Sequence, residues 1–282
     1  RAITLLVFAA SFAFYFLWTD DLIGKVHFPT GDEPYYLLIA HSLVHDRDFE
    51  LTNNFENEDF YHFYPGELYP RHEAVTPKPH FISKHTLGLP VLIALPYLWD
   101  DWRGAAHLMN LIGALLAVNV FLLAHETTQQ WRIALLVWAA LAFSVPLAPY
   151  AVLLFPEAPA ALMILYAFRR LRLWSESSLA QKFFVGLCLA YLPWLHARFL
   201  FIVFGLILFL LVQSWTGALR HRLASLCFPL IPLAASAFLF IAYNLYVYDA
   251  ILPNYADHSG SGTPPEIIAA LFGLFLDQQW GL

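Results

Sequence analysis

Residues 104–124 have the sequence GAAHLMNLIGALLAVNVFLLA, an apolar run without Asp, Glu, Lys or Arg. About 20 apolar residues in an α-helix cross the ~30 Å hydrocarbon core of a bilayer, so this run predicts a transmembrane helix. Similar runs elsewhere predict about seven spans, and we expect an all-α polytopic transmembrane bundle that forms a single domain over residues 1–282. The predicted spans are residues 1–18, 104–124, 131–149, 150–168, 183–195, 197–212 and 223–248.

The composition of the whole chain is that of an integral membrane protein. Of its 282 residues, 60% are apolar and 13% are charged, against roughly 25% charged residues in average soluble domains. This excludes an ordinary soluble enzyme, and the net charge of -6 argues against a nucleic-acid partner. Cys188 and Cys227 both lie in apolar runs, so we expect no disulfide framework. Because the chain starts at Arg1 and stops at Leu282, just after an apolar run, we expect a C-terminally truncated chain.

Two apolar runs are broken by proline. The run over residues 183–212 is too long for one span, and the sequence PWLHAR at residues 193–198 predicts a turn between two helices. A shorter run over residues 87–99 contains Pro90 and Pro96. Its short length and its prolines favour a dip into the outer leaflet and back, and irregular backbone at that depth is tolerated where protein or a water-filled cavity covers it.

The charged residues are sorted along the chain. Residues 19–86 hold twelve acidic and five basic side chains, a net charge of -7, whereas later short connections hold mainly Arg and Lys. Short loops rich in Lys and Arg face the cytoplasm. We therefore expect residues 19–103 to form a long outer loop that carries amphipathic interfacial helices, and residues 249–266 a second outer loop. The expected inner residues are Arg132, Arg169, Arg170, Arg172, Lys182, Arg220 and Arg222.

The sharpest local motif is TGDEPYY at residues 30–36. Pro34 suits the first turn of a helix, and Asp32 or Glu33 suits its N-cap. The pattern over residues 36–45 predicts an amphipathic helix that lies on the membrane surface. Two interpretations are open: the acids only cap this helix, or a carboxylate held at the membrane surface acts as general base towards an acceptor hydroxyl.

A second cluster lies where the outer loop re-enters the membrane, in the sequence PKPHFISKHTLGLP at residues 77–90. Lys84, His80 and His85 either anchor the chain at the level of the lipid headgroups or bind a lipid-linked phosphate. A metal on His41 and His45, four residues apart, is a further alternative.

Ionisable residues also occur inside apolar runs, where they are costly and are functional candidates. Glu157 lies in the sequence FPEAP, and His196 and Arg198 lie in WLHARF. They form either a structural Glu–Arg pair or part of a polar site. In the predicted topology they share the outer face with both outer loops, so we expect all these polar groups to converge on one cavity.

This layout resembles the GT-C superfamily of integral-membrane glycosyltransferases, and within it the bacterial aminoarabinose transferase and protein O-mannosyltransferase branch. The resemblance rests on one span, then GDEPYY at the start of a long outer loop, then many spans. It implies a catalytic acid at Asp32, with Glu33 beside it. The stretch SKHTLGLP at residues 83–90 is similar to the Lys-Pro-Pro-Leu element of the branch, whose lysine faces the donor phosphate. Lys84 matches that lysine, and His85 and Thr86 stand in place of the two prolines.

The resemblance implies transfer of a sugar from a polyprenyl-phosphate donor to a hydroxyl of a protein, lipid or glycan. The reaction is expected at the outer face of a bacterial cytoplasmic membrane, with membrane lipids as further partners and without a metal or other cofactor. Rival functions are a lipid or solute transporter or flippase without transferase activity, and a non-catalytic scaffold or glycan-binding subunit. The site residues expected are Asp32 and Glu33 as catalytic acids, Lys84, His85 and Arg198 for the donor phosphate, and His80, Glu157 and His196 in the cavity wall.

Overall fold

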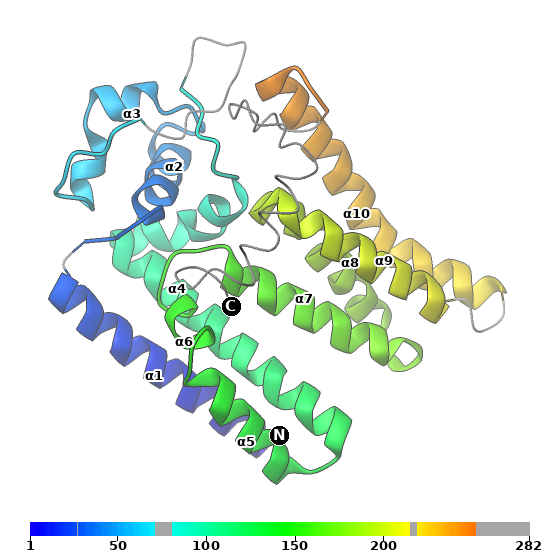
Figure 1. The fold of residues 1–282 in the computed structure, drawn as a ribbon. Coiled ribbons are helices and arrows are strands. Elements are labelled where there is room, and N and C mark those ends of the chain that lie inside the picture. The colour runs from blue at the N-terminus through cyan, green and yellow to red at the C-terminus, as the bar shows by residue number, and fades with distance from the viewer. Residues whose placement is uncertain (27, 71–80, 215–218, 252–282) are drawn as a thin grey trace, which may run out of the picture.

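A computed structural model describes residues 1–26, 28–70, 81–214 and 219–251, with side chains omitted for residues 219–225. These residues form ten α-helices and three short 3-10 helices (Figure 1). A single antiparallel β-bridge, between Glu50 and Ile82, is described in addition. The predicted His80, nearly all of the loop 249–266 and the end of the chain lie outside the described residues.

Four helical stretches are long and apolar enough to cross a membrane. They are α1 (Ala2–Val26), α4 (Gly88–Thr128), residues Ala197–Ser214, which include α9 (Leu200–Ser214), and the Leu226–Tyr248 part of α10 (Leu219–Tyr248). Two further apolar helices, α5 (Trp131–Ala142) and α8 (Leu179–Leu195), are shorter. The prediction of an all-α chain with helices that can span a membrane is confirmed at this level.

The second half of α4 is the centre of the bundle. Helices α1 and α5 both pack against α4, α7 (Glu157–Arg172) packs against α4 and α8, and α8 packs against α10 (Figure 1). Asn110 of α4 donates from Nδ2 to Thr19 Oγ1 of α1 at 2.7 Å and to the carbonyl of Ala151 at 2.9 Å. These interhelical hydrogen bonds satisfy polar groups away from water.

Helix α4 is sharply bent at Asp100 and Asp101, whose backbone angles are not helical. The bend separates a first segment, residues 88–99, from a second segment, residues 102–128. Gly104 is required at this corner, because a Cβ there would lie 2.1 Å from the carbonyl oxygen of Pro96. The first segment is thus a separate short helix at the end of the long one, with Pro96 inside it. The predicted dip of this segment into the outer leaflet stays a prediction.

The predicted helix boundaries between residues 131 and 168 are wrong. Helix α5 ends at Ala142 and α7 begins only at Glu157, with the short α6 (Leu147–Tyr150) between them. The prolines at positions 146, 149 and 156 explain the interruption, because proline removes a backbone donor and disfavours helical geometry in the residue before it. The predicted turn after residue 193 is confirmed: α8 ends at Leu195, and the 3-10 helix η3 (Ala197–Phe199) leads into α9.

Helix α2 (Glu33–His45) is buried on all sides, so the prediction that it lies as an amphipathic helix on the membrane surface is wrong. Every residue from Glu33 to Ser42 is buried. Its polar face is covered by the first segment of α4 and by residues 46–62, which include α3 (Thr52–Glu56) and η1 (Asp59–His62). Neighbouring side chains supply the hydrogen-bond partners: His41 Nδ1 lies 2.9 Å from the Tyr97 hydroxyl, and the Ser42 hydroxyl donates to the Asp48 carboxylate at 2.9 Å.

Candidate functional site

A polar cavity of about 420 Å³ lies where four segments meet. These segments are the start of α2, residues 84–86, residues 155–157 at the start of α7, and the turn between α8 and α9. The structure brings together six of the predicted site residues, although they are as many as 166 positions apart in the chain. The cavity is lined by Asp32, Tyr36, Lys84, His85, Thr86, Phe155, Pro156, Glu157, His196 and Arg198.

Asp32 occupies the N-cap position of α2, and its side chain lines the cavity. Its carboxylate makes no capping hydrogen bond to the described first turn of the helix. The turn before it depends on Gly31, whose φ of 60° is in the left-handed region that favours glycine. A side chain that caps a helix accepts a backbone N–H of the first turn, and Asp32 does not. The structure therefore does not support the interpretation that Asp32 serves only as a helix cap.

Glu33 does not line this cavity, although it is the next residue in the chain. Its buried carboxylate accepts the backbone N–H of Thr30 on Oε2 and the backbone N–H of Leu154 on Oε1, each at 2.8 Å. Burial raises the pKa of Glu33, and the two backbone donors partly offset this effect. Glu33 thus joins the start of α2 to the segment before α7, and we assign it the role of a positioning residue for Asp32.

Glu157 and Arg198 form an ion pair across the cavity wall, through Glu157 Oε1 and Arg198 Nη2. The predicted Glu–Arg pair is therefore present. The Arg198 side chain is 50% exposed, and its guanidinium carries five N–H donors, of which the pair uses only part. The second oxygen of Glu157, Oε2, is buried and has no hydrogen-bond partner among the described residues. The pair therefore leaves polar groups on both side chains for a ligand.

His196 is held as a neutral hydrogen-bond donor. Its Nδ1 accepts the backbone N–H of Arg198 at 3.1 Å, so the neutral ring carries its proton on Nε2. Burial and the positive charge of Arg198 both lower the pKa of His196, against the smaller effect of Glu157. The ring therefore lines the cavity without adding a charge to it at neutral pH.

Residues 84–88 are fixed against the end of α8. The Thr86 hydroxyl donates to the Leu195 carbonyl at 2.6 Å, and the Tyr191 hydroxyl donates to the Gly88 carbonyl at 2.7 Å. A Cβ at Gly88 would lie 2.5 Å from the backbone of Trp194, so only glycine permits this approach. These contacts place the exposed Lys84 and the ring of His85 at the cavity.

Tyr36 is a cavity residue that the sequence analysis missed. Burial raises the pKa of its phenol, and the negative charges of Asp32 and Glu157 raise it further. The phenol is therefore a neutral donor next to two carboxylates. A signal for it was present, because Tyr36 follows Asp32 by four residues at the start of a helix, and residues at this spacing share a face.

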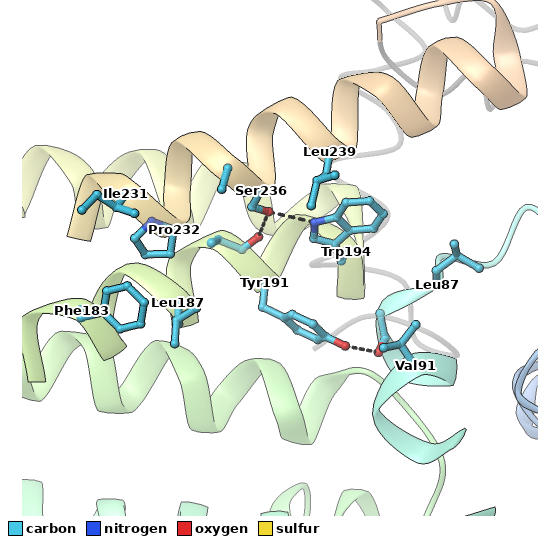
Figure 2. A pocket seen from close by; sticks show the side chains of 13 residues that line it. Leu87, Val91, Phe183, Leu187, Tyr191, Trp194, Ile231, Pro232, Ser236 and Leu239 are labelled. Atoms are coloured by element: carbon cyan, nitrogen blue, oxygen red, sulfur yellow. Dashed lines mark hydrogen bonds between the residues drawn. The ribbon is translucent and has the colours of Figure 1, made fainter. Parts of the chain in front are cut away.

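A second, apolar groove of about 550 Å³ lies between α8, α10 and the start of α4. Figure 2 shows Trp194 of α8 beside Ser236 and Leu239 of α10, and Tyr191 of α8 pointing toward the start of α4. The Trp194 ring is held by a hydrogen bond from Nε1 to the Ser236 hydroxyl at 2.9 Å. A narrow space between the groove and the polar cavity is lined by Lys84, His85 and Thr86 from the cavity, and by Leu87 and Trp194 from the groove.

Within the described ranges, no group of three or more His, Cys, Asp or Glu side chains is arranged to hold a metal ion. The rings of His41 and His45 lie 4.3 Å apart and pack beside each other. The described part of the chain therefore supplies no third ligand for a metal on His41 and His45.

Comparisons of the chain with protein-family models, curated proteins and solved structures give no match. Its function is therefore inferred from the polar cavity and the apolar groove beside it.

Proposed function

We propose that this protein is a membrane glycosyltransferase of the GT-C type, which moves a sugar from a polyprenyl-phosphate donor to an acceptor hydroxyl. The observation that carries the proposal is one cavity that combines the carboxylate of Asp32 with the cations of Lys84 and Arg198, next to an apolar groove. A lipid-phosphate sugar has the same order of parts: a polar sugar, an anionic phosphate and an apolar chain.

The cavity is proposed to face the outside of a bacterial cytoplasmic membrane, in a bundle of about seven spans with residues 19–103 as the outer loop. Helix α7 supports this orientation, because it begins at Glu157 in the cavity and ends in a basic cluster. Its 16 residues correspond to about 24 Å of helix. At the far end Arg169 and Arg170 both bind Glu126, and basic clusters of this kind favour the cytoplasmic side.

In the proposed reaction, the oxygen of the acceptor hydroxyl forms a bond to the anomeric carbon as the bond from that carbon to the phosphate oxygen breaks. Asp32 accepts the hydroxyl proton, and the leaving phosphate takes the electron pair of the broken bond. Attack from the side opposite the phosphate inverts the configuration. General-base assistance of this kind typically contributes a factor of about 10²–10⁴.

We assign to Lys84 and Arg198 the role of stabilising the negative charge that grows on the leaving phosphate. The neutral donors of His196 and Tyr36 are proposed to bind the phosphate or the sugar hydroxyls, together with His85. The loss of one such preorganised donor typically costs about 3 kcal/mol of transition-state stabilisation. The cavity holds two acidic side chains, Asp32 and Glu157, and two basic ones, Lys84 and Arg198, so the basic side chains are not in excess.

The apolar groove of Figure 2 is assigned to the first part of the lipid chain. Residues 84–87 line the narrow space that adjoins both the cavity and the groove, which supports the proposal that the phosphate binds at Lys84 when the chain enters the groove. The narrow space between them requires the side chains to rearrange as the donor binds, because it has a volume of only about 10 Å³.

The test is discharge of a radiolabelled polyprenyl-phosphate sugar by the protein in nanodiscs. We expect Asp32→Asn to lose at least about 100-fold in rate, with donor binding retained. Glu56→Gln, which changes an exposed carboxylate outside the cavity, is the matched control. Discharge that Asp32→Asn leaves at the wild-type rate would overturn the general-base assignment. Movement of the labelled lipid across a vesicle membrane without discharge would instead support the transporter.

A further inference from the structure

A second polar groove, of about 500 Å³, lies at the bend of α4. Residues 61–65 form one wall, and residues 100–103 together with Ile23 of α1 form the other. It shares no lining residue with the cavity that contains Asp32. The proposed transfer reaction therefore makes no use of this groove.

The groove is rich in aromatic side chains that their neighbours hold in place. Tyr61 packs against Phe60, with ring centroids 4.7 Å apart, and is still 49% exposed. Tyr64 packs edge to face on Phe28 at 5.9 Å, and Trp102 is partly exposed in the opposite wall. Rings that are fixed before binding lose little entropy on contact with a ligand, and their faces suit the C–H surfaces of a sugar ring.

Polar groups of both kinds accompany these rings. Asp100 and Asp101 are exposed carboxylates without an ion pair in the part of the chain that the structure describes. Arg103 is also exposed, and its Nε lies 3.9 Å from Asp20 Oδ1. Carboxylates accept hydrogen bonds from hydroxyl groups, and a guanidinium donates to hydroxyl or ring oxygens, so the groove offers both partners that a sugar needs.

The backbone of Asp101 is strained at the edge of the groove. Its φ of 44° and ψ of -135° are a conformation that a residue with a Cβ adopts only with strain. Glycine would adopt it without that strain. An aspartate therefore occupies a position where glycine fits the backbone better, at the edge of an aromatic groove, and strained residues of this kind cluster at ligand sites.

We infer that this groove binds an uncharged sugar unit of a glycan. A neutral ligand with many hydroxyls would use the exposed ring faces, the two carboxylate acceptors and the guanidinium donor together, whereas a cation has no use for the guanidinium. A metal ion is disfavoured as well, because His62, Asp100 and Asp101 are not arranged as ligands of one ion. The inference goes beyond the proposed transferase function and holds whether or not that function is correct.

The experiment is saturation-transfer NMR on the protein in nanodiscs with cellobiose, chitobiose and xylobiose as neutral probes, and choline as a cationic probe. We expect at least one disaccharide to receive saturation at its C–H protons, and choline not to displace it. Tyr61→Ala and Asp100→Asn are both exposed substitutions, and we expect each to weaken the disaccharide signal at least fivefold. Tyr69→Ala is the matched control, because Tyr69 is an exposed tyrosine of the same segment that does not line the groove.

Asp101→Gly adds a readout that a purely structural aspartate would not give: a higher melting temperature together with weaker disaccharide binding. The inference is overturned if none of the three disaccharides receives saturation, or if choline displaces a bound disaccharide. It is also overturned if the wild-type, Tyr61→Ala and Asp100→Asn proteins give equal saturation. Discharge of the lipid-linked sugar separates this test from that of the transferase, since Asp32→Asn is expected to abolish discharge and to leave disaccharide binding unchanged.

Discussion

The substitution Glu33→Gln tests how the start of α2 is positioned. The Glu33 carboxylate accepts two backbone N–H groups, from Thr30 and Leu154, and is 2% exposed. A hydrogen bond to a charged acceptor contributes roughly 1.5–3 kcal/mol. Glutamine has one carbonyl oxygen, so it keeps one of these bonds as a weaker neutral bond and turns its amide N–H₂ towards the other donor.

The expected loss in the free energy of unfolding is about 2 kcal/mol. One buried N–H without an acceptor costs roughly 1–3 kcal/mol, and weakening of the remaining bond adds to this. Relief of the buried charge subtracts from it, because the raised pKa of Glu33 shows that burial of the carboxylate is not fully offset. A loss of this size lowers the melting temperature by roughly 4–8 °C.

The measurement is a thermal unfolding curve of the protein in nanodiscs, read by intrinsic fluorescence, with Glu56→Gln as the control for an exposed glutamate. Donor discharge is expected to fall as well, because Asp32 is no longer held against the segment before α7. A melting temperature of Glu33→Gln equal to that of the control would refute the assignment of Glu33 as the residue that joins these two segments.

Three further predictions concern other contacts. Burial lowers the pKa of His41, and His45 and His62 add to this effect while Asp59 and Asp46 oppose it. The stability contributed by neutral His41 is therefore fully present above pH ~6.5, the ordinary value for histidine, and falls as the pH drops below it. His41→Gln should flatten this part of a plot of melting temperature against pH. Gly88→Ala should cost about 1–3 kcal/mol, since its Cβ would meet the backbone of α8 at 2.5 Å, whereas Gly205→Ala, with open space around its Cβ, should be neutral or stabilising in the same unfolding assay. Arg198→Ala should change stability by less than about 1 kcal/mol, because the ion pair of Arg198 with Glu157 is half exposed. The same substitution should raise the KM for the donor at least tenfold in the discharge assay. An unchanged KM would leave Arg198 only a structural role.

The convergence of Asp32, Lys84, Glu157 and Arg198 on one cavity could be predicted because it follows from topology. The sorting of Lys and Arg predicts which loops share one side of the membrane, and polar residues at helix ends on the same side are then expected to share a surface. The break after residue 193 could be predicted for a similar reason, since proline and two ionisable side chains interrupt an apolar run there.

The parts that could not be predicted depend on packing between distant segments. The pattern of α2 is amphipathic, but the partners of His41 and Ser42 come from residues 48 and 97, so a polar helix face became a buried one. Glu33 and Asp32 differ in direction because Leu154, 121 residues later, supplies a donor to only one of them. The apolar groove depends on how closely α8 approaches α10, which hydrophobic periodicity does not specify.

The segment of residues 84–87 borders the polar cavity, the narrow space and the apolar groove at once. The hydrogen bond from Thr86 to Leu195 and the close approach of Gly88 to α8 hold this segment in place, so one of its residues cannot move without its neighbours. In the proposed transferase, the choice of lipid carrier and the choice of sugar are therefore expected to depend on each other. We expect a variant selected for a shorter or bulkier carrier, by changes near Leu87 or Trp194, to shift Lys84 as well and to need a second selection for its sugar.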